Sequence, residues 1–440
     1  MTELKRDLGL FSSTMLVAGN MIGIGIFVTA GRIYNHIPDP GYILLAWIFG
    51  GFLSLSGALA YAELGTRFPR AGGGYVYLTE AFGPLMGFLA GFSSSLVTIP
   101  GTSAFLGIGF AKYAGITDPM MAKGVAISLI FGISLINYWG VLKGARLQDM
   151  FMILKLALIF LLIGAGFFSG NGSFEHFAVR SEPPYSLWVG IPLAMVPIMY
   201  TYSGWDATAY VAGEIKDPRR TIPFSLFMGT LMVALVYMAL ACLYIYAIPV
   251  TGLDTSPDKK VKIVTAASEV LFGSGVAKFV GGVVAVSILG TLSATILTGP
   301  RIIYAMAKDN LFPAMAKEVH PVFSTPGKAI WFQAVWASML AMTGTFDQLL
   351  DYVTVPMVFF AALAAVGLFV IRFRDHADAD AIPYKTWGYP VLPALFILGM
   401  GWILVSTALK TPKDSLWGLA IVSLGIPTYF IWRRFYVKKF

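Results

Sequence analysis

Residues 19–27 read Gly-Asn-Met-Ile-Gly-Ile-Gly-Ile-Phe, inside an apolar stretch long enough to cross a membrane. Three glycines among these nine residues weaken a continuous helix. The hydrocarbon core contains no water, so an irregular backbone survives there only where it lines a cavity or an ion site. The run therefore predicts a broken transmembrane helix and a buried binding site.

The composition places the whole chain in a membrane. Of its 440 residues, 57% are hydrophobic and 12% are charged, and the mean hydropathy is +0.75. Apolar stretches recur and leave no room for a soluble domain. We expect an all-α polytopic membrane protein with twelve transmembrane helices, in one domain over residues 1–440. The predicted spans are 10–34, 41–65, 82–111, 122–140, 148–168, 186–212, 223–248, 276–306, 328–346, 349–371, 388–409 and 414–432.

Lysine and arginine are distributed unevenly over the predicted loops. With a cytoplasmic N-terminus, about 20 of the 31 fall in inside loops and tails, and about 10 in outside loops. This bias predicts a multi-pass protein of the cell membrane with both termini in the cytoplasm. Topology and anionic lipid also explain the net charge of +8, which excludes nucleic acid as a partner.

A second interruption lies in the sixth span, where residues 200–206 read Tyr-Thr-Tyr-Ser-Gly-Trp-Asp after Pro192 and Pro197. It follows the first interruption by five spans. Broken spans at matching positions of two halves are typical of inverted-repeat transporters, which bind substrate at mid-membrane. We expect one repeat over 10–168, a second over 186–371 and two additional helices over 388–432.

The two breaks together suit a zwitterion. A broken helix exposes free amides at one end and free carbonyls at the other. Amides bind a carboxylate and carbonyls bind an ammonium group, so an α-amino acid is the predicted substrate. The expected carboxylate ligands are the amides around Gly23, Ile24, Gly25 and Ile26, and the expected amine ligands are the carbonyls around Tyr200, Thr201 and Ser203.

A simpler interpretation of Gly19 and Gly23 is a close contact between helices, because glycines four residues apart are common at such contacts. Helix packing alone does not require Gly25, Asn20 or the independent break in the sixth span. The binding-site interpretation accounts for all of these features.

Lys155 lies several residues inside the fifth span. An ammonium group there costs at least about 2.5–3.5 kcal/mol, so the residue either extends to the cytoplasmic interface or serves a purpose inside the protein. We favour an internal tether that binds the unwound first span, with the Ser287 hydroxyl completing the site. A fixed cation in that place predicts transport without sodium.

Several motifs along the whole chain resemble the amino acid, polyamine and organocation transporter superfamily, and within it the L-type amino acid transporter branch, as a prokaryotic-like member. Any one of them is weak, but together they are specific. They are Gly-Ile-Gly-Ile-Phe at 23–27, Tyr-Ala-Glu-Leu-Gly at 61–65, Gly-Gly-Gly-Tyr-Val-Tyr at 72–77, Gly-Val at 140–141, Gly-Ala-Arg-Leu-Gln at 144–148 with Lys155, Gly-Glu-Ile-Lys-Asp-Pro-Arg-Arg-Thr-Ile-Pro at 213–223, Arg-Ile-Ile-Tyr-Ala-Met at 301–306, Lys-Thr-Pro at 410–412 and Gly-Ile-Pro at 425–427.

The resemblance implies a five-plus-five inverted repeat with two extra helices, alternating access, and sodium-independent amino acid exchange. It gives Tyr200 the position of an aromatic gate above the substrate. It also gives Lys155 the position of a lysine that replaces bound sodium.

Three departures from the family pattern bear on the substrate and partners. Ile24 stands where the family commonly has a hydroxyl residue, so we expect carboxylate binding by the main chain alone. Ser203 stands where relatives that accept cationic substrates can carry an acid, which favours neutral substrates. Residues 114–123 lack the cysteine that joins animal light chains to a heavy chain, so we expect no such partner.

The predicted function is a sodium-independent secondary carrier of neutral L-amino acids that works as an exchanger. The alternatives are proton-coupled uptake of amino acids or polyamines, with Lys155, Asp206 or Glu63 titrating, and a non-transporting receptor or channel on the same fold. Asp206 can bind a substrate amine, bind a proton or cap a helix end. Further pocket candidates are Met21, Thr102, Gly204, Asp206 and Tyr352.

No enzymatic site competes with transport. The four histidines are scattered over predicted loops without metal-ligand spacing, so we expect neither a metal nor a cofactor. Charges in the predicted cytoplasmic loops can form a gate network or simply fix the topology. These charges are Glu63, Arg67, Glu214, Arg219, Arg220, Arg301 and Asp309.

Overall fold

The structure is a computed structural model that describes residues 3–182, 185–252, 263–343, 346–375, 382–410 and 412–436. Helices account for most of these residues, and the described part contains no strand beyond one isolated bridge between Leu8 and Ile215. The all-α fold class predicted from the composition is confirmed.

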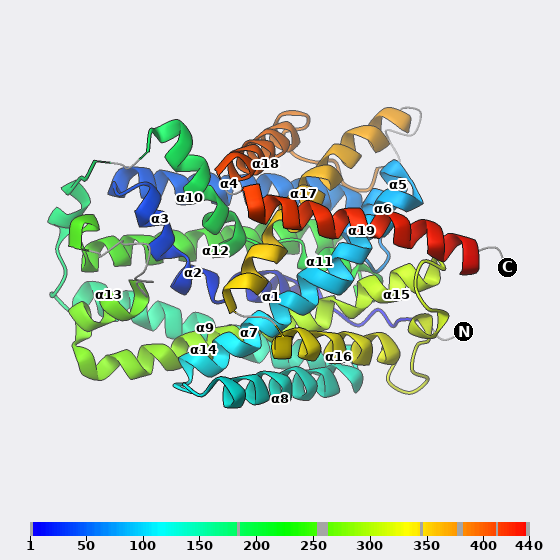
Figure 1. Cartoon of the computed structure of the whole chain (residues 1–440), viewed down its shortest axis with the longest axis horizontal. Coiled ribbons are helices and arrows are strands. Elements are labelled where there is room, and N and C mark those ends of the chain that lie inside the picture. The colour runs from blue at the N-terminus through cyan, green and yellow to red at the C-terminus, as the bar shows by residue number, and fades with distance from the viewer. Residues whose placement is uncertain are drawn as a thin grey trace.

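Each predicted span of the first half corresponds to one helix or to a row of shorter ones (Figure 1). The first span contains α1 (Leu10–Met21), α2 (Gly25–Val28) and α3 (Ala30–His36), the second is α4 (Pro40–Arg67), the third contains α6 (Pro84–Ser93), η1 (Ser94–Thr98) and α7 (Ile99–Tyr113), the fourth is α8 (Pro119–Tyr138) and the fifth is α9 (Val141–Phe168).

The second half follows the same pattern. The sixth span contains α10 (Leu187–Thr201) and α11 (Ala207–Tyr210), the seventh is α12 (Pro218–Ala247), the eighth contains α14 (Ala277–Thr298) and α15 (Pro300–Lys308), the ninth is α16 (Gly327–Thr343), the tenth is α17 (Phe346–Arg374), the eleventh is α18 (Val391–Lys410) and the twelfth is α19 (Pro412–Tyr436). Nine helices of the described part are long and apolar enough to cross a membrane.

Two helices lie outside the predicted spans. They are α5 (Gly74–Phe82), before the third span, and α13 (Ile263–Phe272), before the eighth. The remaining short turns are η2 (Phe174–Ala178), η3 (Ala212–Glu214), η4 (Val250–Gly252), η5 (Ser274–Val276) and η6 (Ala314–Lys317).

Local sequence fixes where several spans begin. Asp39 precedes α4, and its carboxylate accepts a hydrogen bond from the amide of Tyr42. Asp118 caps α8 in the same way, through the amide of Met121. In both helices a proline occupies the first helical position, where its missing N–H leaves no bond unmade.

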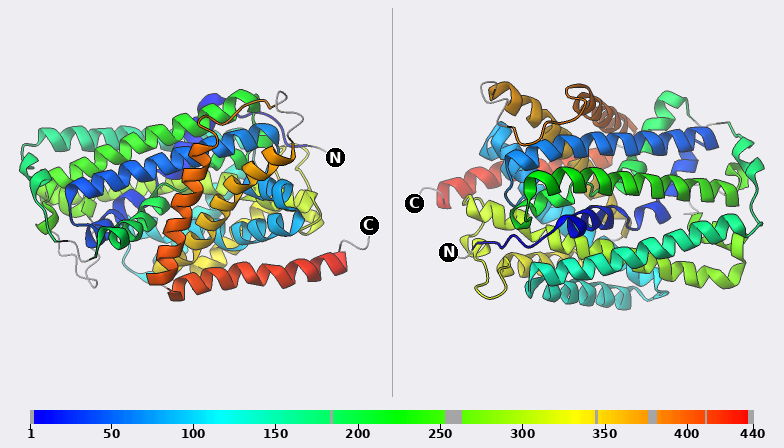
Figure 2. Two further views of the ribbon diagram at one scale, coloured as in Figure 1. Left: turned by 90° about the horizontal axis from the view of Figure 1, so that it is seen from above. Right: turned by 180° about the vertical axis from the view of Figure 1, so that it is seen from behind.

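Both interruptions read from the sequence are present. The first span is broken between α1 and α2, over residues 22–24, and the sixth between α10 and α11, over residues 202–206. α1 packs against α9, α12 and α14, and the right-hand view of Figure 2 shows it between α12 and α9. Because the first break sits in the middle of the molecule, a site formed there is enclosed by helices on several sides. Both chain termini lie at one end of the bundle (Figures 1 and 2).

Candidate functional site

The two broken spans meet at their glycines. A Cβ atom on Gly25 would lie 2.9 Å from the Thr201 hydroxyl oxygen, and one on Gly204 would lie 2.8 Å from the Asn20 side-chain nitrogen. Gly204 also has a φ of +96°, which favours glycine. A hydrogen bond of 2.7 Å between the Thr29 and Thr201 hydroxyls joins the same two spans. The glycines are therefore the reason that the two breaks form one site.

The first break presents free backbone amides. Gly23 donates to the Met21 carbonyl at 2.8 Å and Phe27 to the Ile24 carbonyl at 3.1 Å. Between them, the amides of Ile24, Gly25 and Ile26 donate to no acceptor in the described part of the chain. They are three of the four predicted carboxylate ligands, and the fourth, the Gly23 amide, is already engaged by the Met21 carbonyl. The three lie at the start of α2, where the helix dipole favours negative charge.

The second break offers carbonyls, but not all of them are vacant. The Tyr200 carbonyl accepts bonds from the Ser203 amide at 3.0 Å and the Ser203 hydroxyl at 2.6 Å. The Thr201 carbonyl accepts a bond of 3.0 Å from Tyr237. The Ser203 carbonyl has no donor among the described residues. Of the three predicted amine ligands, Ser203 therefore has the most accessible carbonyl.

Lys155 lies at the first break and not at the membrane surface. Its side chain is fully buried, and its ammonium group donates to the carbonyls of Gly19, at 3.2 Å, and Ile22. These carbonyls end α1 and would otherwise lack partners. The observed position agrees with an internal tether and rules out extension to the interface in this conformation.

The hydroxyl beside Lys155 belongs to Thr291 and not to Ser287 as predicted. The Thr291 hydroxyl lies 2.9 Å from the Gly19 carbonyl, 2.8 Å from the Ile22 carbonyl and 3.4 Å from the Lys155 nitrogen. The Ser287 hydroxyl is buried and has no partner in the described part of the chain. The two residues lie one turn apart on the same face of α14. The sequence therefore predicted the correct face of this helix, but a hydroxyl one turn too early.

This correction gives a test of the tether. We expect Thr291→Val to lower amino acid exchange by about 10-fold, because the buried carbonyls of Gly19 and Ile22 lose the one hydroxyl proton that lies within hydrogen-bond distance of both. Ser287→Ala, one turn away, should retain close to full exchange. Radiolabelled exchange in proteoliposomes, normalised to the amount of folded protein, measures both. The reverse ranking would contradict the arrangement.

Tyr237 also joins the two breaks, and sequence reasoning missed it. Its hydroxyl lies 2.6 Å from the Met21 carbonyl and 3.0 Å from the Thr201 carbonyl. It comes from α12, and its ring packs against Trp47 and Tyr202. Within an apolar run such a tyrosine is indistinguishable from an ordinary core aromatic, so the sequence carried no signal for this role.

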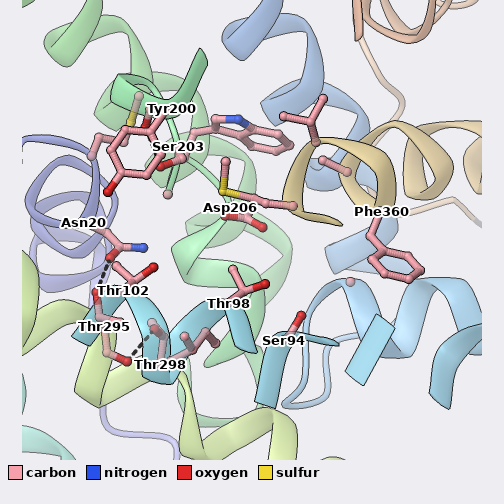
Figure 3. Close-up of a pocket in the computed structure, with 18 of the residues that line it drawn as sticks. Asn20, Ser94, Thr98, Thr102, Tyr200, Ser203, Asp206, Thr295, Thr298 and Phe360 are labelled. Atoms are coloured by element: carbon pink, nitrogen blue, oxygen red, sulfur yellow. Dashed lines mark hydrogen bonds between the residues drawn. The ribbon is translucent and has the colours of Figure 1, made fainter. Parts of the chain in front are cut away.

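A cavity of about 150 Å³ adjoins the two breaks (Figure 3). Of the predicted residues, Ile26 does not line it, and Lys155 and Ser287 lie outside it. Tyr352 belongs to α17, but its side chain falls outside the described residues. Those that do line the cavity are Met21, Gly23, Ile24, Gly25, Thr102, Tyr200, Thr201, Ser203, Gly204 and Asp206.

Tyr200 stands at one wall of this cavity. Its ring meets that of Phe105, from α7, edge-on at a centroid distance of 6.1 Å. This contact between the sixth and third spans is compatible with an aromatic gate. Figure 3 shows Tyr200 on the same side of the cavity as Ser203.

The predicted gate charges fall into separate clusters. The fully buried Glu63 accepts hydrogen bonds from Arg67, from Arg372 and from the amide of Thr386. Glu214 and Arg301 form a second, fully buried pair at 2.7 Å. A third contact joins the Asp309 carboxylate to the Tyr75 hydroxyl at 2.7 Å. Arg219 and Arg220 are exposed and form no ion pair with the described residues.

Comparison with known proteins gives one family. A family model described as amino acid permease matches residues 8–431. The chain is 30% identical to the serine/threonine exchanger SteT of Bacillus subtilis, over 97% of each protein. It is 28% identical to human Asc-type amino acid transporter 1, over 98% of this chain and 83% of that protein. It is also 28% identical to human large neutral amino acids transporter small subunit 2, over 97% of this chain and 80% of that protein.

Proposed function

Because the chain belongs to the amino acid permease family, we propose that it is a sodium-independent exchanger of neutral L-amino acids that works by alternating access. Family membership makes the protein a multi-pass membrane transporter of amino acids and not an enzyme. The sodium independence, the class of substrate and the exchange mode are the proposed parts.

The position of Lys155 is the observation that carries the proposal. An unwound helix end in a membrane needs a cation or other donors for its carbonyls. Here the Lys155 ammonium and the Thr291 hydroxyl already contact the carbonyls of Gly19 and Ile22. A fixed cation in this place leaves no requirement for a sodium ion.

The backbone groups of the site and the names of two relatives support a neutral amino acid as the substrate. The three free amides of Ile24, Gly25 and Ile26 suit a carboxylate, and the Ser203 carbonyl suits an ammonium group. The zwitterionic part of any α-amino acid satisfies both. Two relatives are named for serine/threonine and for large neutral amino acids, which agrees with a neutral side chain.

The topology and partners complete the proposal. The even number of predicted spans and the lysine and arginine bias support our proposal that both termini are cytoplasmic and that the protein lies in the cell membrane. The loop between α7 and α8 contains no cysteine, so the carrier works without a disulfide-linked heavy chain.

Counterflow in proteoliposomes tests sodium independence. We expect uptake of labelled amino acid to require unlabelled neutral amino acid inside, and to change by less than about two-fold when potassium replaces sodium, because the Lys155 ammonium is a fixed cation. A sodium requirement would contradict the proposal. Uptake into empty vesicles, driven by a pH gradient alone, would favour the proton-coupled alternative.

The proton-coupled alternative is favoured by one observation, the Asp206 carboxylate in the cavity, which has no cationic partner among the described residues. A receptor that does not transport would bind amino acids and show no counterflow. The same experiment therefore separates all three functions.

A further inference from the structure

Three hydroxyl residues follow one side of the third span. Ser94, Thr98 and Thr102 are spaced four residues apart, and all three line the cavity (Figure 3). None of the three hydroxyls forms a hydrogen bond with the described residues. Ser103, on the same helix, instead donates to the Ile99 carbonyl at 3.0 Å, as hydroxyl side chains in membrane helices commonly do. We call Ser94, Thr98 and Thr102 the hydroxyl strip.

The strip begins at an irregular turn of the helix. Residues 94–98 form the π-helical turn η1, in which the amide of Ile99 donates to the Ser94 carbonyl five residues earlier. Pro100 has no amide to donate to the Leu96 carbonyl, which instead accepts a bond of 2.7 Å from the Trp336 indole. Single π turns within helices occur frequently at functional sites.

Asp206 faces the same cavity from the sixth span. In Figure 3 it lies between Ser203 on one side and Thr98 and Ser94 on the other. It is the only Asp, Glu, Lys or Arg among the described residues that line the cavity. Its carboxylate accepts one side-chain hydrogen bond, of 2.8 Å, from Tyr210. A carboxylate can accept about four, so acceptor capacity remains.

We propose that Asp206 and the hydroxyl strip form a side-chain subsite that selects amino acids with a small hydroxyl side chain. The proposal rests on the proposed function, because the breaks must bind the zwitterionic part of the substrate. A substrate hydroxyl donates to the Asp206 carboxylate and accepts from a hydroxyl of the strip. An aliphatic side chain of the same size leaves these groups unpaired in a site with little water.

A hydroxyl on the substrate side chain fits this subsite better than an ammonium group in the same place. The two breaks contact each other through Gly204 and Asn20, and Lys155 contacts the Gly19 and Ile22 carbonyls on either side of Asn20. No ion pair joins Lys155 and Asp206 among the described residues, but counted together their opposite charges leave the region of the two breaks without net charge. An additional ammonium group would leave the occupied site with a net positive charge, at a cost in the membrane interior.

Threonine and valine provide a matched test, because they have the same shape and differ in one hydroxyl group. We expect the wild-type protein to prefer threonine by about 10-fold or more in competition for counterflow, as a hydrogen bond to a charged group is worth that factor. Asp206→Ala should reduce the preference to about two-fold or less. Thr98→Val should reduce it partly, and Ser103→Ala, on the same helix but outside the cavity, should not change it.

The absolute affinity for valine is the second readout. If Asp206→Ala lowers the affinities for threonine and valine by the same factor, the carboxylate binds the α-amino group and the proposal is wrong. It is also wrong if wild-type protein prefers 2,3-diaminopropionate to threonine, because the subsite then selects a cation. Absence of any counterflow by the wild type would instead refute the proposed function. A variant that fails to fold is identified by gel filtration, and Asp206→Asn then replaces it, with a smaller expected loss of preference.

Discussion

Lys155→Ala is expected to lower amino acid exchange by at least about 100-fold. The ammonium group makes two hydrogen bonds to the carbonyls of Gly19 and Ile22 in a fully buried place. Bonds to a charged donor are worth roughly 1.5–3 kcal/mol each, and about 2.7 kcal/mol already corresponds to a factor of 100. Thr291 retains its contacts with both carbonyls, so the fold survives while the geometry of the break relaxes.

Lys143→Ala is the matched control for this prediction. Lys143 lies on the same helix, α9, but its side chain is exposed and its nitrogen lies 5.8 Å from the centre of the Trp139 ring. We expect exchange close to that of the wild type. Both variants are measured by counterflow and normalised to the amount that elutes as folded protein in gel filtration. Exchange by Lys155→Ala within about three-fold of the wild type would refute the tether.

Much of the fold could be predicted because membrane insertion leaves a local signal. Apolar length predicted the spans, and glycine and polar residues within them predicted both breaks. α5 escaped prediction because Gly72, Gly73 and Gly74 read as a loop and the helix is only nine residues long. The π turn at Ser94–Thr98 escaped because it depends in part on Trp336, which is remote in sequence.

The site could be predicted only as far as periodicity and charge allow. Lys155 was conspicuous because a charge within a span is rare. Ser287 and Thr291 lie on one face of α14, and only the packing of α14 against α1 decides which hydroxyl reaches the Gly19 carbonyl. Tyr237 gave no signal at all, because its role lies in two contacts with distant carbonyls.

Gly25→Val is expected to abolish amino acid binding. A Cβ atom at this position would lie 2.9 Å from the Thr201 hydroxyl oxygen and 3.0 Å from the Thr201 Cα atom. Thr201 cannot easily retreat, since its hydroxyl is held at 2.7 Å by both the Pro197 carbonyl and Thr29. The clash must therefore move the break itself. A displacement of about 1 Å in positioned groups can cost 100-fold.

Gly164→Val separates this effect from a general intolerance of membrane helices to valine. Gly164 lies in α9, and a Cβ atom there would meet nothing within 4 Å. We expect it to bind amino acid with wild-type affinity, whereas Gly25→Ala should already lose about 10-fold, because its single Cβ meets the Thr201 backbone. Ligand-induced thermal stabilisation of the purified variants reports affinity without requiring transport. Wild-type stabilisation of Gly25→Val would mean that the amides of Ile24, Gly25 and Ile26 do not hold the carboxylate, since binding there cannot survive a displaced backbone.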